Sequence, residues 1–122
     1  KTGTAQVFTV KQNEKYNASR IDERLRDHAL YMAYAPAENP QIALALVVEN
    51  AGFGGVNAAP IARRVFDYWL LGLYPNEQDM AAVQKGQAQA PLGKPRLASE
   101  VPDLPSPPMA HAAQAPLQMV QR

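Results

Sequence analysis

The sequence predicts an α+β fold in which three antiparallel strands are packed against one helix. Three observations predict it: residues 1–10 alternate and are rich in β-branched side chains, residues 29–35 and 41–49 form two apolar runs, and an amphipathic segment begins at Pro60. Strands repeat every two residues and helices every 3.6, so these patterns distinguish the two kinds of element. The expected order is strand, polar excursion, strand, strand, helix and tail.

The first strand is expected in the segment KTGTAQVFTV at residues 1–10. Residues two apart share a strand face, and the two faces comprise Thr2, Thr4, Gln6 and Phe8 against Lys1, Gly3, Ala5 and Val7. Gly3 weakens a strand interior, so its presence suggests that something must approach the backbone at this position.

Residues 11–28 are polar, and we expect an excursion with a short helix rather than a strand. Ser19 and Asp22 have the spacing of a weak helix-capping pair. The segment also carries interleaved charges, namely Arg20, Arg24 and Arg26 beside Asp22, Glu23 and Asp27. Because opposite charges alternate, a solvated and self-paired surface is favoured over an anion-binding site.

The two apolar runs are expected to form a central strand pair. Five residues bounded by prolines, Pro36–Pro40, join the runs and suit a hairpin loop. Both runs are too apolar for a sheet with one wet face, so we expect the pair to be covered on both faces. Residues 50–57, NAGFGGVN, contain three glycines and are expected to form an irregular turn.

A helix is expected from Pro60, because proline is tolerated in a first turn, and Gly72 and Pro75 mark its end. Its apolar stripe comprises Ile61, Val65, Phe66, Trp69, Leu70 and Leu73. All nine aromatic residues precede residue 75, whereas eight of the eleven prolines lie in residues 75–122. We therefore expect residues 1–74 to fold as one unit and residues 75–122 to form a disordered tail rich in Pro, Ala and Gln.

Composition argues against several classes of function. The 122 residues carry 12 Lys and Arg against 11 Asp and Glu, so no cationic excess indicates a nucleic-acid partner. With no cysteine and two histidines, disulfides are ruled out and a metal centre is not expected. No 18-residue apolar run is present, so we expect no membrane-spanning segment in this chain.

One motif carries chemistry, and it consists of Lys1, Thr2 and Gly3 followed by Thr4. Thr2 and Thr4 offer two hydroxyls to a carboxylate, and Lys1 adds a positive charge nearby. Gly3 leaves room for a substrate backbone along the strand, whose edge can supply a backbone N–H to an oxyanion hole. In serine acyltransferases this tripeptide accompanies S-x-x-K and S-x-N. Neither pattern occurs at any of the three serines, so the nucleophile and its base are expected outside this chain.

The motif opens a longer series of segments: KTGTAQVF, YNA, RLRDHALYMAYAP, NPQIALALVVEN and the glycine turn. In this order, over about residues 1–74, they resemble the C-terminal end of a class B penicillin-binding protein. The resemblance implies the penicillin-recognising transpeptidase fold, a mainly antiparallel five-stranded sheet between helical layers. This chain would supply its third, fourth and fifth strands and its closing helix.

The resemblance also implies a role for each residue of the motif. Thr2 and Thr4 would bind the carboxylate of the substrate's D-alanine, or that of a β-lactam. Thr4 would donate its backbone N–H to the oxyanion hole. Lys1 would tune the electrostatics around the S-x-N serine, which is not in this chain, and around the substrate carboxylate. Gly3 completes the family's third motif, and residues 11–26 would border the active-site groove. The implied activity is D,D-transpeptidation in cell-wall elongation through a serine acyl-enzyme, without a cofactor.

Partners and location are implied in the same way. The partners would be peptidoglycan stem peptides, β-lactam antibiotics, the upstream remainder of the domain, a SEDS-type glycosyltransferase and the scaffold proteins of the rod complex. The location would be the bacterial inner membrane, with the anchor upstream and the catalytic domain in the periplasm. The chain opens abruptly at Lys1 and is interpreted as a piece of a larger protein that is inactive alone.

Two other classes of protein fit parts of the sequence. A non-catalytic interaction module would bind a protein partner through the hairpin, the helix and the tail, whereas a serine β-lactamase or carboxypeptidase would share the strand motif. Asp27 and His28 could form half of a catalytic triad, but a structural histidine at the strand entry is favoured. Glu49 at a strand end and Trp69 on the apolar stripe are also interpreted as structural.

Overall fold

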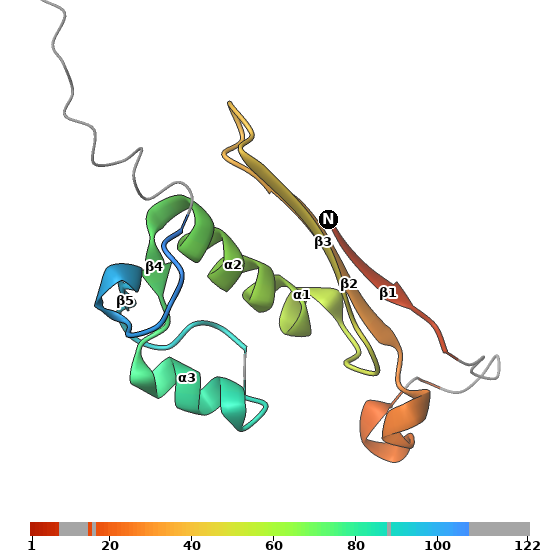
Figure 1. The fold of residues 1–122 in the computed structure, drawn as a ribbon. Helices are drawn as coiled ribbons and strands as arrows, with labels where there is room; N and C mark the ends of the chain where they lie inside the picture. Colours follow the sequence, from red (N-terminus) through yellow and green to blue (C-terminus); the bar gives the residue numbers. More distant parts are fainter. Residues whose placement is uncertain (8–14, 16, 88, 108–122) are drawn as a thin grey trace, which may run out of the picture.

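The computed structural model describes residues 1–7, 15, 17–87 and 89–107 (Figure 1). Its strands and helices are β1 (Thr2–Ala5), β2 (His28–Ala35), β3 (Ile42–Val48), α1 (Gly54–Asn57), α2 (Ala59–Leu71), β4 (Leu73–Tyr74), α3 (Glu77–Gln84) and β5 (Arg96–Leu97). Three short 3-10 turns are η1 (Ala18–Arg20), η2 (Glu23–Leu25) and η3 (Ala98–Glu100). The α+β class predicted from the sequence is confirmed.

β1, β2 and β3 form an antiparallel sheet with β2 in the centre. Leu30 of β2 pairs with Gly3 on one side and with Val47 on the other. The β2–β3 hairpin closes where the Gln41 N–H donates to the Ala35 carbonyl oxygen at 2.8 Å. The predicted strand pair and hairpin are therefore confirmed. β1 itself ends at Ala5, and residues 8–10 of the predicted first strand lie outside the described residues.

The two faces of the sheet differ in cover. Figure 1 shows α1 and α2 on one side of the sheet. Burial alternates along β3, and every second side chain, on the better-covered face, is half-buried. On the opposite face Met32, Tyr34 and Val47 are 57%, 62% and 59% exposed. The sequence predicted cover on both faces, whereas the described residues supply it on one. Apolar composition shows that a face avoids water, but not whether the same chain or another part of the protein covers it.

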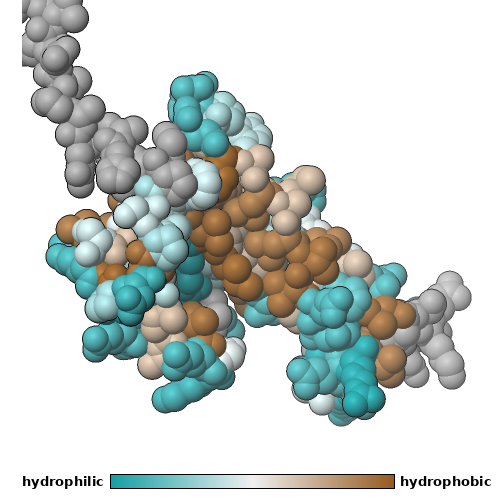
Figure 2. Space-filling model, viewed as in Figure 1, coloured by the Kyte–Doolittle hydropathy of each residue, from teal (hydrophilic) through white to brown (hydrophobic). Residues whose placement is uncertain are grey.

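The helical layer consists of α1 followed by α2. The segment predicted as an irregular turn ends in α1, a single helical turn that begins at Gly54. α2 has Pro60 in its first turn and ends at Gly72, whose φ of 63° is left-handed, as the sequence predicted. An apolar band follows this layer in Figure 2, and the exposed apolar residues of the two helices are Val56, Ile61, Val65 and Leu71. None of the described helices combines the length and apolar character needed to cross a membrane.

The structure differs from the predicted disordered tail over residues 75–87 and 89–107. We call these residues, together with Gly72–Tyr74, the C-terminal extension. It contains α3 and η3, and β4 pairs antiparallel with β5. Its order comes from polar side chains that bond to the backbone, so the lack of apolar periodicity did not indicate disorder here. Residues 108–122 of the predicted tail lie outside the described residues.

The polar excursion contains η1 and η2 in place of the predicted short helix. Their caps are Asn17 and Asp22, whose side chains accept hydrogen bonds from the N–H groups of Ser19 and Arg24 at 3.1 and 3.0 Å. Each cap therefore closes its own short turn, and the predicted pairing of Ser19 with Asp22 across one helix is not what the structure shows. Residues 11–14 and 16 of this region lie outside the described residues.

Candidate functional site

The predicted site residues are consecutive: Lys1 directly precedes β1, and Thr2, Gly3 and Thr4 lie on it, at an edge of the sheet. β1 pairs with β2, and within the described part of the chain its other edge carries no strand. The register places Thr2 opposite Tyr31 and Thr4 opposite Ala29. An open strand edge presents unpaired backbone N–H and C=O groups, which can bind an extended peptide as an additional strand.

Two hydroxyl groups and one ammonium group gather along this edge. Thr2 and Thr4 are exposed, and because they are two residues apart they share a strand face at a separation of about 7 Å. The Lys1 ammonium donates to the carbonyl oxygen of Thr2 at 2.8 Å, which keeps its charge beside the strand. Hydroxyl donors next to a cation suit the carboxylate of a peptide or of a small molecule.

Gly3 lies between the two threonines and is half-buried. A Cβ atom at this position would lie 3.3 Å from the Cβ of Leu30, its partner in the register, which is a tight contact. Packing against β2 therefore gives a reason for this glycine in addition to the substrate approach expected from the sequence. That substrate approach stays a prediction.

Asp27 and His28 link the start of β2 to the segments beside it. His28 Nδ1 accepts a hydrogen bond from the Asn50 N–H at 2.9 Å, and Asp27 Oδ1 accepts one from the Val7 N–H at 3.2 Å. The Asn50 side-chain amide also donates to the carbonyl oxygen of Arg26 at 3.1 Å. This use of Nδ1 supports the structural interpretation of His28 over the triad. Part of the predicted groove loop, residues 11–26, lies outside the described residues.

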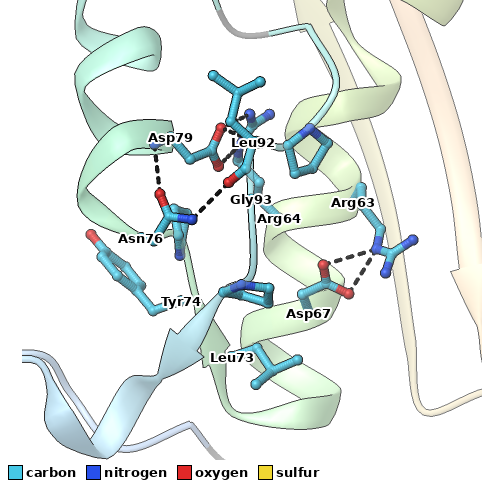
Figure 3. A pocket seen from close by; sticks show the side chains of 12 residues that line it. Arg63, Arg64, Asp67, Leu73, Tyr74, Asn76, Asp79, Leu92 and Gly93 are labelled. Atoms are coloured by element: carbon cyan, nitrogen blue, oxygen red, sulfur yellow. Dashed lines mark hydrogen bonds and ion pairs between the residues drawn. The ribbon is translucent and has the colours of Figure 1, made fainter.

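A second polar cluster lines a cavity of about 280 Å³ between α2 and the C-terminal extension (Figure 3). Arg64 donates to both carboxylate oxygens of Asp79, at 2.6 and 2.9 Å, and Asp79 is 2% exposed. The Leu92 N–H donates to the same carboxylate at 3.1 Å. The hydrogen bonds from Arg64 hold the pKa of Asp79 below its ordinary value, the Leu92 N–H adds to this, and burial opposes it.

This cluster contains no residue that the sequence predicted as functional. Asn76 accepts from the Asp79 N–H at 2.8 Å and donates to the carbonyl oxygens of Leu92 and Lys94 at 2.7 and 3.0 Å. Asn76 followed by acidic residues in the first helical turn is a helix-start signal that could have revealed α3. Because its members bond to one another, the cluster fastens the extension to α2. The described residues contain no group of three or more potential metal ligands.

Comparison with known proteins identifies the family. Residues 1–67 match the family model described as the penicillin binding protein transpeptidase domain, which is more than half of the chain. The chain belongs to this family. It is a C-terminal fragment of a transpeptidase domain, and the predicted family and fold are confirmed.

Relatives of this chain are named as peptidoglycan D,D-transpeptidases. Peptidoglycan D,D-transpeptidase MrdA of Haemophilus influenzae is 54% identical over 70 residues, which cover 57% of this chain and 11% of that protein. MrdA of Escherichia coli is 47% identical over 90 residues, which cover 74% of this chain and 14% of that protein. The chain thus spans about a tenth to a seventh of the length of these relatives. No solved structure matches the chain.

The comparison with Escherichia coli MrdA reaches into the extension. A match of 90 residues in a chain of 122 must include residues 33–90 wherever it begins, and these contain α3. The family model itself ends at residue 67, inside α2. Relatedness to MrdA therefore continues past the transpeptidase model into the segment that Asn76 and Asp79 organise.

Proposed function

We propose that this chain forms the carboxylate-binding edge of the active site of a peptidoglycan D,D-transpeptidase that acts in cell-wall elongation and is inhibited by β-lactams. Family membership supports the general part of this proposal, namely that the chain is part of a transpeptidase domain related to MrdA. The observation that carries the finer proposal is the exposed pair of hydroxyls, Thr2 and Thr4, with Lys1 beside them on an open strand edge.

The proposed reaction is acyl transfer in two steps. A serine outside this chain attacks the D-Ala–D-Ala amide of a stem peptide, D-alanine leaves, and the amine of a neighbouring stem peptide resolves the acyl-enzyme. The stem peptide lies along the open edge of β1. Thr2 and Thr4 bind the substrate carboxylate, the Thr4 N–H stabilises the oxyanion, and the Lys1 charge favours both anionic groups.

The proposal includes a location and partners for the whole protein. The domain works in the periplasm, held at the inner membrane by a segment outside this chain. Its substrates are peptidoglycan stem peptides, and its partners are a SEDS-type glycosyltransferase and the scaffold proteins of the rod complex. The support for these features is the relationship to MrdA.

The test is covalent labelling of the full-length protein by a fluorescent penicillin. We expect one label per molecule, on a serine of an S-x-x-K motif, and no label on the isolated 122-residue chain. An acyl-enzyme that hydrolyses within seconds would assign the protein to the β-lactamases instead. A full-length protein that takes no label would overturn the enzymatic proposal and favour the interaction module.

A further inference from the structure

Gly54, the first residue of α1, lies directly against the backbone of β1 and of its neighbour β2. It is buried, and a Cβ atom built on it would lie 2.1 Å from the carbonyl oxygen of Leu30 and 2.7 Å from that of Gly3. Real Cβ atoms essentially never approach other heavy atoms within 3.0 Å. A residue with any side chain at position 54 therefore requires α1, β1 or β2 to move.

The two carbonyl groups that Gly54 touches belong to one pair in the sheet. Gly3 and Leu30 are partners in the β1–β2 register. On the other face of this pair, a Cβ atom on Gly3 would lie 3.3 Å from the Cβ of Leu30, so its absence leaves room for the Leu30 side chain. Two glycines thus allow close contact on both faces of the same pair. The pair lies at the centre of β1, between the two threonines.

A displacement caused at position 54 would reach β1 through the Gly3–Leu30 pair, because both carbonyl oxygens in close contact belong to this pair. Because β1 is hydrogen-bonded to β2 and, within the described residues, pairs with no other strand, a shift of β2 carries β1 with it. Relieving the contact with the Leu30 oxygen needs a shift of about 1 Å. A misplacement of about 1 Å in a catalytic site can cost roughly a hundredfold in rate.

We propose that Gly54 is a positioning residue. Its lack of a side chain lets α1 pack closely against the Gly3–Leu30 pair, and this contact determines the position of β1. The position of β1 in turn determines where the Thr2 and Thr4 hydroxyls and the Thr4 N–H meet the reacting groups. This inference rests on the proposed function. Gly54 does not touch substrate; it acts through the backbone of β1.

The neighbouring Gly55 supplies a matched control. A Cβ at this position would lie 3.6 Å from Thr2 Cγ2, an ordinary contact, and Gly55 is exposed. Gly55→Ala makes the same chemical change in the same helical turn, with the same gain in helix propensity of about 1 kcal/mol. It differs from Gly54→Ala in the contact with the strand backbone.

The experiment compares full-length wild type, Gly54→Ala and Gly55→Ala in reaction with the fluorescent penicillin. The labelled fraction and the acylation rate constant of that fraction are recorded separately, together with the melting temperature. We expect Gly54→Ala to lower the rate constant at least tenfold and Gly55→Ala to stay within twofold of wild type. A wild-type rate constant in Gly54→Ala, with or without a smaller labelled fraction, would overturn the inference. A wild type that takes no label would instead refute the proposed function.

A second measurement covers the case in which Gly54→Ala yields no folded protein. In full-length wild type, hydrogen exchange of β1 is compared with that of the peptide containing α1. If packing of α1 holds β1 in place, the two segments open together, and their protection factors against hydrogen exchange agree within a factor of three. β1 exchanging at least tenfold faster than α1 would contradict the inference.

Discussion

The sheet with its helices α1 and α2 and the C-terminal extension are held together by different means. In the first region, backbone lies on backbone: β1 and β2 are paired, and Gly54 rests on their carbonyl groups. In the extension, polar side chains bond to backbone and to one another, and Asp79 is the largest side chain that is fully buried among the described residues. The first region tolerates little displacement, whereas the second depends on a few removable side chains.

This difference separates two kinds of mutational effect. A change at β1 is expected to alter acylation while leaving the extension closed. A change at the Arg64–Asp79 ion pair is expected to open the extension while leaving acylation intact. The adjacent arginines Arg63 and Arg64 of α2 provide a direct comparison beside the extension. The ion pair of Arg63 is exposed, whereas that of Arg64, which reaches the extension, is buried.

The largest expected effect is that of Arg64→Ala, which leaves the Asp79 carboxylate buried without its guanidinium partner. Breaking a buried ion pair by removing one member typically costs about 3–5 kcal/mol. We expect the free energy of opening the extension to fall by about 3 kcal/mol, measured by hydrogen exchange of residues 73–87 in the full-length protein. Unchanged protection, or a parallel loss of penicillin acylation, would contradict the division into two regions.

Thr4→Val comes next, with its effect confined to the site. Val keeps the size of the side chain and removes the hydroxyl, and a hydrogen bond to a charged group contributes about 1.5–3 kcal/mol. We expect the acylation rate of the full-length protein to fall about 10- to 100-fold, without a change in hydrogen exchange of the extension. Thr9→Val, at a position outside the described residues, is the control; equal rates in the two variants would remove the role given to Thr4.

Acidification is expected to weaken the extension less than Arg64→Ala does, because the Arg64 side chain stays in place. The folded-state pKa of Asp79 lies below its ordinary value of 3.8 because Arg64 donates hydrogen bonds to it. The stabilisation is therefore complete above the unfolded pKa and is lost as the pH falls through the lower folded pKa. Hydrogen exchange of α3, corrected for intrinsic rates, should accelerate as the pH drops below about 3.8. Asp79→Asn should abolish this dependence; an equally steep one in that variant would assign it to another group.

The smallest expected effect is that of Arg63→Ala. Arg63 pairs with Asp67 one helical turn away at 2.7 Å, but its side chain is 65% exposed. Exposed pairs at this spacing contribute about 0.3–0.5 kcal/mol. Protection of the extension should change by less than about threefold. A loss as large as that of Arg64→Ala would show that burial does not distinguish the two pairs.

Local signals explain which parts of the fold could be predicted from the sequence. Pro36 and Pro40 bound the hairpin, and Pro60 and Gly72 bound α2, because these residues restrict the backbone wherever they occur. The motif on β1 was recognisable for the same reason: its residues are adjacent in sequence.

Features that depend on distant contacts could not be predicted in this way. Gly54 meets Gly3 and Leu30 across 51 and 24 positions of sequence, and nothing in the segment NAGFGGVN says which glycine is buried. The extension was missed because its order comes from Arg64 and Asp79, two charged residues 15 apart, and not from an apolar stripe.

The measurement that tests the central claim most directly is the structure of the full-length protein after reaction with a penicillin. The account predicts that the β-lactam carboxylate lies within hydrogen-bond distance of the Thr2 and Thr4 hydroxyls, with the acyl oxygen accepting from the Thr4 N–H. An acylated protein in which β1 makes none of these contacts would contradict it.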